Sequence, residues 1–421
     1  MVKKIVLKNG LRIILAPQRS SLAATVLVLA EAGSEYETKN ISGLSHFLEH
    51  LAFKGTEKRP KSGMIGSELD AMGAEYNAFT AQEYTGYWAK TQSHTLPQVL
   101  DIVSDLYLNP IFKKEEIEKE RGVIIEEINM YEDTPMRRVH DFFTTLLYGD
   151  QPAGWDIAGR KEVIRRLERE DFIKYRTRHY IAPATVVVVS GDFNQKYVTT
   201  HVKKFFGNLR HQPKSPKPKT REHQTRPQAL IKFKESDQTH LVLGTRAFTI
   251  FDKRRYALQM LSDILGGGMS SRLFHRIREE LGAAYYVRAS SDLFSDHGYF
   301  AVSAGVDHAK INTVIETILQ ELGRMREELV ESGELQKAKG HMIGNLILSL
   351  ETSDELAAFY GGQEILTRLI IKPEEFMRRI QRVTAEEIRN AARLLFTNAK
   401  LNLAVIGPYR KPEAFRKILK F

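Results

Sequence analysis

The sequence predicts an α+β fold built from two homologous domains of the α/β-sandwich type, each with a mostly antiparallel sheet covered by helices. Three observations support this prediction. The chain has 421 residues, which is too long for one ordinary hydrophobic core. Its two halves show the same succession of strand-like and helix-like segments, a repeat of roughly 200 residues. A segment rich in proline and lysine separates them near the midpoint. We expect domains over residues 1–210 and 229–421, a linker over 211–228, and a clamshell arrangement with a chamber between the domains.

The first half begins with strand-like runs. Asn9-Gly10 lies between β-rich segments within residues 4–15 and predicts a hairpin. The apolar run 22–30 predicts a buried strand, because it is too short to cross a bilayer. The remaining expected elements are helices at 42–53 and 67–72, strands within 74–90, long helices at 96–108 and 114–131, and a strand at 185–191.

The second half repeats this order. The expected elements are strands at 229–233 and 239–247, helices at 255–265 and 271–281, strands within 284–304, long helices at 309–329 and 333–350, and a strand at 401–407. Both halves therefore end on an apolar strand that precedes a glycine.

The expected helix at 42–53 is amphipathic. Ser42 is predicted to cap its beginning and Gly55 to follow its end. Its apolar face consists of Leu44, Phe47, Leu48, Leu51 and Ala52. His46, Glu49 and His50 project from the opposite face.

This polar face predicts a zinc site. Two histidines at i and i+4 lie one above the other and can bind a single Zn²⁺, and the order H-x-x-E-H places Glu49 close enough to act on a water molecule without binding the metal. The chain has no cysteine, so zinc has to be bound by histidine and carboxylate. We expect one zinc ion per chain. The alternative, two surface histidines at a chance spacing, does not explain why spacing, amphipathicity and end signals agree.

A third ligand is expected from the helix at 114–131. Its buried stripe consists of Ile117, Ile124 and Ile128. Glu116, Glu120 and Glu127 follow the edge of that stripe, whereas Glu126 projects nearly opposite. Because acidic groups beside a core are costly unless paired or bound to metal, Glu127 is the better ligand and Glu120 its supporting partner. The alternative is a charged face in solvent.

The charge pattern argues against nucleic acid as a partner. The formal charge is +10, but lysine and arginine are spread along the chain and interleaved with glutamate. A basic nucleic-acid-binding protein remains the alternative class. Lys8, Asn9, Gly10 and Arg12 interrupt the apolar core that a signal peptide needs, so we expect a cytoplasmic protein that does not contact a membrane.

Three stretches of the first half resemble the pitrilysin/insulinase peptidases, nearest to the branch that includes the processing-peptidase subunits. They are His46-Phe-Leu-Glu49-His50-Leu-Ala-Phe-Lys-Gly-Thr56, Asn77-Ala-Phe-Thr80 and Glu120-Arg-Gly-Val-Ile-Ile-Glu-Glu127. The likeness extends over essentially the whole chain. It implies zinc on His46, His50 and Glu127, Glu49 as general base, and a supporting role for Glu120.

In the second half, the stretch from Gly266 to Tyr285 is similar to the family's Arg…Tyr element. The resemblance implies that Arg278 and Tyr285 reach across the chamber to the substrate backbone and the oxyanion, where both groups suit developing negative charge. Taken alone, the stretch also fits a glycine-rich turn into a helix that holds a phosphate, or an ordinary helix with surface charges. Ala283-Ala284 departs from the larger residue common in relatives, which affects substrate preference.

Residues 75–80 are the expected substrate strand. They alternate in polarity, and an exposed sheet edge there would bind an extended peptide through main-chain hydrogen bonds, with Asn77, Ala78 and Phe79 in contact with it. The alternative is an ordinary internal strand.

The predicted function is that of a zinc endopeptidase acting on peptides or unfolded polypeptides, active as a homodimer. The alternative is a non-catalytic or partner-dependent subunit of a processing-peptidase-like heterodimer.

Overall fold

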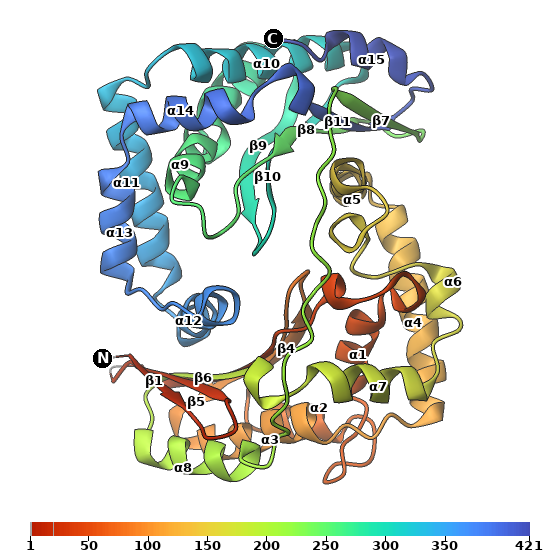
Figure 1. The fold of residues 1–421 in the computed structure, drawn as a ribbon, viewed down its shortest axis with the longest axis vertical. Coiled ribbons are helices and arrows are strands. Elements are labelled where there is room, and N and C mark those ends of the chain that lie inside the picture. Colours follow the sequence, from red (N-terminus) through yellow and green to blue (C-terminus); the bar gives the residue numbers. More distant parts are fainter. Residues whose placement is uncertain (1, 20) are drawn as a thin grey trace. The chain divides into compact units, whose positions relative to one another are not determined.

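The computed structural model describes residues 2–19 and 21–421, and its helices and strands form two compact units (Figure 1). Unit 1 consists of Met1–Asn129, Trp155–Pro218 and Leu348–Ile370, and unit 2 consists of Met130–Gly154, Lys219–Ile347 and Ile371–Phe421. The fold is α+β, as predicted. The units differ from the predicted ranges 1–210 and 229–421 at two segments, because one helix from each half of the sequence packs on the sheet of the other half.

Unit 1 contains a sheet with the strand order β1-β2-β6-β3-β5-β4. Its strands are β1 (Lys3–Val6), β2 (Arg12–Pro17), β3 (Ala23–Ala30), β4 (Glu75–Thr80), β5 (Thr85–Gln92) and β6 (Thr185–Gly191). The predicted hairpin at Asn9-Gly10 is confirmed, since β1 and β2 pair antiparallel and Gly10 has φ +87°. Among the described strands of this sheet, β2 and β6 are the one pair of parallel neighbours.

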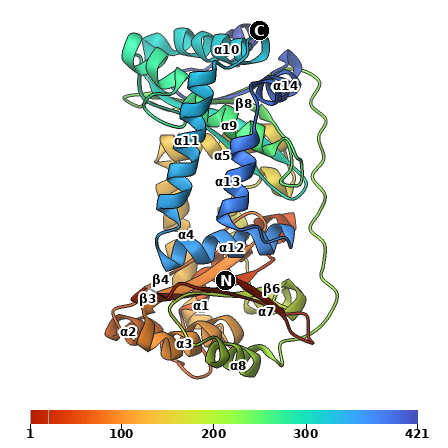
Figure 2. The ribbon, with the colours of Figure 1, turned by 90° about the vertical axis from the view of Figure 1, so that its left-hand side faces the viewer.

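The central strand β6 is buried along its whole length, which explains its unbroken run of valines. Helix α12 (Ser353–Thr367) covers one face of the sheet (Figure 2). There it packs on Ile14, Ala16, Leu27, Leu29, Val186 and Val188. Residues at alternate positions point to the other face, where α3 (Leu96–Leu108) and α8 (Gln195–Phe206) contact the strands.

The other α-helices of unit 1 include α1 (Leu44–Ala52) and α4 (Lys114–Glu132, whose last three residues belong to unit 2), which carry the candidate ligands. The rest are α2 (Met64–Ala71), α6 (Lys161–Ile164) and α7 (Arg169–His179). The helices predicted at 42–53 and 114–131 therefore exist, with ends that differ by one or two residues.

The sheet of unit 2 repeats the architecture of unit 1. Its strands are β7 (Gln228–Phe233), β8 (Thr239–Arg246), β9 (Ala284–Leu293), β10 (Gly298–Val306) and β11 (Asn402–Gly407). The order β7-β11-β8-β10-β9 has one parallel pair, β7 with β11, and otherwise antiparallel neighbours. This is the order and orientation of β2-β6-β3-β5-β4, so the predicted duplication is confirmed.

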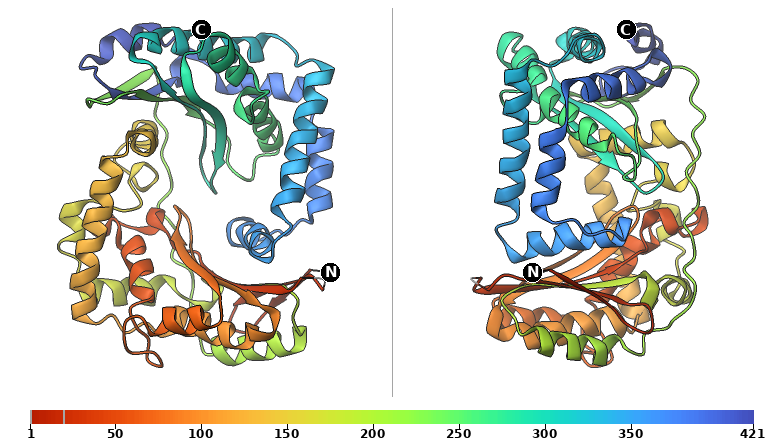
Figure 3. Two further views of the ribbon diagram at one scale, coloured as in Figure 1. Left: turned by 180° about the vertical axis from the view of Figure 1, so that it is seen from behind. Right: turned by 60° about the vertical axis from the view of Figure 1, so that its left-hand side comes forward.

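Helix α5 (Pro135–Tyr148), from the first half of the sequence, covers one face of this second sheet (Figure 3). Its Val139 and Phe143 pack with Val242, Ala301 and Ala404. The opposite face is covered by α9 (Arg255–Gly266), α10 (Ile311–Glu327) and α14 (Ala385–Leu395). The remaining helices are the π-helix η6 (Phe274–Glu280), α11 (Ser332–Ser349), α13 (Pro373–Arg382) and α15 (Pro412–Ile418).

The predicted linker forms neither helix nor strand between residues 211 and 226. Within unit 1 it is held by Lys217, whose ammonium group lies 3.0 Å from Glu83 and also pairs with Glu35. None of the helices in the described part of the chain combines the length and the apolarity needed to span a bilayer.

Candidate metal centre

Helix α1 presents an apolar face to the core and a polar face to the site. Leu44, Phe47, Leu48 and Leu51 are each at most 2% exposed. These residues recur at the three- and four-residue spacing that places side chains on one face of a helix. The opposite face consequently projects His46, Glu49 and His50, as predicted from the sequence.

The beginning of α1 differs from the prediction. The cap is not Ser42: helix α1 starts at Leu44, and Gly43 precedes it with φ +92°. The buried carboxylate of Glu37 accepts hydrogen bonds from the backbone N–H groups of Gly43 (2.7 Å) and Ser45 (2.6 Å). Gly43 is required because a Cβ there would lie 2.6 Å from the carbonyl oxygen of Ala158. The helix ends at Ala52, three residues before the predicted terminator Gly55.

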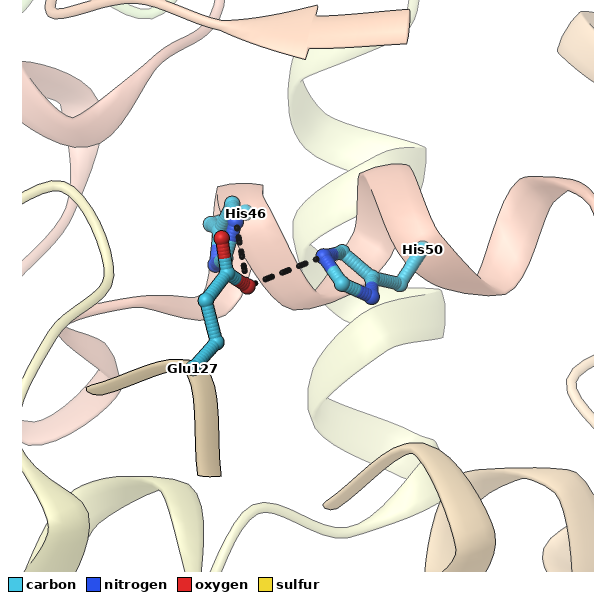
Figure 4. A group of neighbouring side chains, drawn as sticks. All are labelled: His46, His50 and Glu127. Carbon is cyan, nitrogen blue, oxygen red and sulfur yellow. Dashed lines mark ion pairs between the residues drawn. The ribbon is translucent and has the colours of Figure 1, made fainter. Parts of the chain in front are cut away.

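His46, His50 and Glu127 converge on one point (Figure 4). The Nε2 atoms of His46 and His50 each lie 3.5 Å from the same oxygen, Oε2 of Glu127. One ligand atom from each residue lies within 4.8 Å of the other two. The two imidazoles come from α1 and the carboxylate comes from α4, so the packing of these two helices creates the arrangement.

The donor set fits zinc. Two imidazole nitrogens and one carboxylate oxygen are the ligands of catalytic zinc sites that keep a fourth position open. In a tetrahedral site with metal–ligand bonds of about 2.0–2.1 Å, neighbouring ligand atoms are about 3.3 Å apart. The two observed separations of 3.5 Å are close to that value.

Helix α4 is anchored so that its glutamates face α1. Ile124 is fully buried, and the guanidinium group of Arg121 donates to the carbonyl oxygens of Leu167 (2.8 Å) and Ile164. Glu120, 5% exposed, lies beside His50, with its Oε2 3.3 Å from Nδ1. Its other oxygen lies 2.7 Å from the ammonium group of Lys54.

Glu49 lies beside the three candidate ligands and is held by β4. The hydroxyl of Thr80 donates a hydrogen bond of 2.6 Å to Oε2 of Glu49. Burial raises the pKa of Glu49, and the negative charge of Glu127 adds to this, although the bond from Thr80 and the charge of His50 oppose it. A carboxylate with a raised pKa and a fixed orientation suits proton transfer near neutral pH.

The carboxylates also change the pKa of His50. Burial lowers it, but hydrogen bonds with Glu120 and Glu127 outweigh burial and raise the pKa of His50 to about 9. The pKa of Glu120 is lowered, since the bonds from His50 and Lys54 outweigh its burial. Without a metal ion, the proton on His50 therefore offsets part of the negative charge of the glutamates.

The expected substrate strand lies at a sheet edge. β4 pairs with β5 alone among the described strands, so its other edge has main-chain groups that no strand pairs with. The N–H of Ala78 donates a hydrogen bond of 2.8 Å to Oδ1 of Asn77. Asn77 is exposed, Ala78 is buried, and Phe79 packs edge-to-face on Tyr84. An internal position in the sheet, the alternative considered from the sequence, is thereby excluded.

Arg278 and Tyr285 belong to unit 2, so the structure of unit 1 by itself does not bring them to the histidine pair. Arg278 lies in η6, where the predicted α-helix is replaced by a π-helix, a form often found at functional sites. Tyr285 lies on β9 and is 75% exposed.

Three residues have contacts that the sequence analysis did not predict: Thr80, Lys54 and Glu37. Thr80 shares a strand face with Ala78, and this alternation was the available signal. Lys54 follows His50 by four residues, but it lies beyond the end of α1. Glu37 had no local signal, because it caps the helix from a preceding loop.

Two family models together match most of the chain. One, described as Insulinase (Peptidase family M16), matches residues 12–161, and the other, described as Peptidase M16 inactive domain, matches residues 166–342. His46, His50 and Glu127 all lie within the first match.

Individual proteins are similar along their whole length. An uncharacterized zinc protease of Streptomyces coelicolor is 34% identical, over 99% of this chain and 91% of the relative. One from Bacillus subtilis is 33% identical, over 97% of this chain and 98% of the relative. The crystal structure of a protease from Helicobacter pylori has a TM-score of 0.91 at 24% identity, over 96% of this chain and 99% of that chain. At that identity, the likeness concerns the fold.

Proposed function

The chain belongs to peptidase family M16, the insulinase family, and on this premise we propose that it is a zinc-dependent endopeptidase that hydrolyses peptides or unfolded polypeptides. The observation that supports this most directly is the convergence of two imidazole nitrogens on one oxygen of Glu127. The name of the second family model, an inactive domain, agrees with a single metal centre in the first half and one zinc ion per chain.

The proposed reaction is hydrolysis of a peptide bond. His46, His50 and Glu127 would hold the zinc ion, which when bound polarises a carbonyl oxygen and lowers the pKa of a bound water. Glu49 takes a proton from the attacking water and returns it to the leaving amine. Thr80 fixes the orientation of Glu49 through its 2.6 Å hydrogen bond. Glu120, itself paired with Lys54, orients the ring of His50 through Nδ1.

The substrate is proposed to bind in extended form along the open edge of β4. Main-chain hydrogen bonds at such an edge recognise conformation more than sequence, which suits peptides and unfolded chains. Arg278 and Tyr285 are proposed to bind the substrate backbone and the oxyanion from a second domain that faces the first across a chamber. The proposal also retains a homodimer in the cytoplasm, as expected from the sequence.

The test is hydrolysis of a mixed set of unstructured peptides by the purified chain, next to the Glu49→Gln variant, with bound zinc measured in both. Cleavage by the wild type alone, with zinc retained in both, is the expected result. Absence of zinc from both proteins would overturn the assignment of His46, His50 and Glu127. Zinc in both without cleavage by either would replace the proposal with a non-catalytic or partner-dependent subunit.

A further inference from the structure

Unit 2 contains a cavity of about 960 Å³. Of its lining residues, the proposed function gives a role to Arg278 alone. Five parts of unit 2 line it: the beginning of α5, the glycine turn Gly266–Gly268 at the end of α9, the π-helix η6, the middle of β9, and Ser303 of β10. Because all of these segments belong to one compact unit, the cavity is a property of that unit alone.

Three guanidinium groups from three different elements line this cavity. Arg137 comes from α5, Arg278 from η6 and Arg288 from β9. Arg137 stacks on the ring of Tyr131 (3.2 Å to the centroid), and Arg278 lies over Phe274 (5.0 Å). Within residues 2–19 and 21–421, none of the three arginines forms an ion pair with a carboxylate. No aspartate or glutamate is among the described lining residues, which are Thr134, Met136, Arg137, His140, Gly266, Gly267, Gly268, Met269, Phe274, Arg278, Tyr286, Val287, Arg288, Ala289, Ser290 and Ser303.

The acidic groups behind the lining already have partners. Asp263 accepts a hydrogen bond from His341 at 2.8 Å. Asp292 interacts with Tyr299 and with His140. Burial lowers the pKa of His140, which disfavours the charged imidazole, although the charge of Asp292 opposes this.

The glycines of the turn lie at the end of α9. Gly267 follows the C-terminal end of α9, and its N–H donates to the carbonyl oxygen of Asp263. The C-terminal end of a helix carries partial negative charge, which disfavours a phosphate there. The turn instead allows close packing, since a Cβ at Gly266 would lie 2.2 Å from the backbone nitrogen of Ala289.

Resting on the proposed peptidase function, we propose that this cavity is a subsite for carboxylate groups of the substrate, and that the enzyme prefers acidic peptides. Guanidinium groups bind carboxylates through two parallel hydrogen bonds, and arginines without a carboxylate partner are available for that contact. Arg137 and Arg288 are the specificity residues of this subsite, beside Arg278.

The experiment measures peptide binding without cleavage. Fluorescence anisotropy of the zinc-loaded Glu49→Gln protein compares an unstructured peptide that contains aspartate and glutamate with the same peptide carrying asparagine and glutamine. We expect the acidic peptide to bind about tenfold more tightly, and Arg137→Gln or Arg288→Gln, each in the Glu49→Gln background, to reduce that ratio at least about fivefold. Arg416→Gln, which removes an exposed arginine of α15 outside the cavity, is the matched control.

Amidation of the C-terminus identifies the source of the carboxylate. It leaves the affinities of both peptides unchanged if acidic side chains occupy the cavity, and weakens both peptides equally if the terminal carboxylate does. A ratio near one with weaker binding of both amidated peptides would replace the preference for acidic peptides with recognition of the terminal carboxylate. A ratio near one without an effect of amidation, or an equal loss of preference in Arg416→Gln, would overturn the subsite, the latter by showing that overall charge is responsible. If the wild type cleaves no peptide, the proposed function fails, whereas the binding ratio still decides whether the cavity selects carboxylates.

Discussion

Glu120 lies with its Oε2 3.3 Å from Nδ1 of His50, the ring nitrogen that does not face Glu127. A carboxylate in this position fixes the tautomer and orientation of a metal-binding histidine. The first prediction is therefore that Glu120→Gln lowers zinc affinity about 10–100-fold, as measured by competition with a fluorescent chelator. Glu126→Gln on the same helix is the control, because Glu126 is exposed. Equal affinities for the two variants would remove Glu120 from the site.

The second prediction concerns the proton on His50. In the metal-free protein, contacts with Glu120 and Glu127 outweigh burial and raise the pKa of His50 to about 9, so below that pH the ring carries a proton that zinc has to displace. Zinc affinity is expected to rise by at least about one log unit per pH unit, hence about 100-fold from roughly pH 6.5 to 8.5. Chelator competition, corrected for the chelator's own protonation, measures this. A zinc affinity that does not change over that pH range would contradict the prediction.

The third prediction concerns Glu37, the buried cap of α1. Burial raises its pKa to about 8, against bonds from Ser45 and Gly43 that lower it. Between the unfolded value of about 4.3 and about 8, the folded chain holds a proton that the unfolded chain releases. Retention of this proton stabilises the folded chain. The stabilisation is complete below the unfolded pKa and is lost as pH rises through the folded pKa, at about 1.4 kcal/mol per pH unit.

The measurement compares the wild type with Glu37→Gln, which does not titrate. From about pH 5.5 to 7.5, the free energy of unfolding of the metal-free wild type is expected to fall by about 2–3 kcal/mol more than that of the variant. Parallel pH profiles would show that the two N–H donors hold Glu37 ionised in the folded protein.

Periodicity and spacing predicted most of what positions the candidate site. The heptad-like burial of Leu44, Phe47 and Leu51 placed both histidines on one face of α1, and the same reasoning on α4 preferred Glu127 to Glu126. These inferences succeeded because they depend on contacts within one helix. The repeated order of strands was also visible, since β6 and β11 are apolar runs that end at a glycine.

Features that depend on contacts between distant segments were not predictable in this way. The cap of α1 comes from Glu37, which no local motif connects with Gly43. An apolar helix face predicts burial but does not specify the sheet it covers. For this reason the sequence did not show that α5 covers the second sheet or that α12 covers the first.

The last prediction tests whether unit 1 depends on α12, a helix contributed by the second half of the sequence. Ala357 is fully buried against Leu27, Leu29 and Val188, whereas Ala358, the next residue, is exposed. Ala357→Glu places a carboxylate in this apolar contact and is expected to destabilise unit 1 by about 3–5 kcal/mol. Ala358→Glu adds the same charge at a solvent-facing position and is expected to change stability by no more than about 0.5 kcal/mol.

Release of bound zinc during denaturant titration reports on unit 1, because His46, His50 and Glu127 all belong to it. Ala357→Glu should release zinc at a clearly lower denaturant concentration than the wild type, and Ala358→Glu at the same concentration. Identical release curves for both variants would mean that α12 contributes little to the stability of the sheet that supports the site. Early release from Ala357→Glu alone would instead show that the stability of the metal-binding unit depends on α12, a helix of the second half of the sequence.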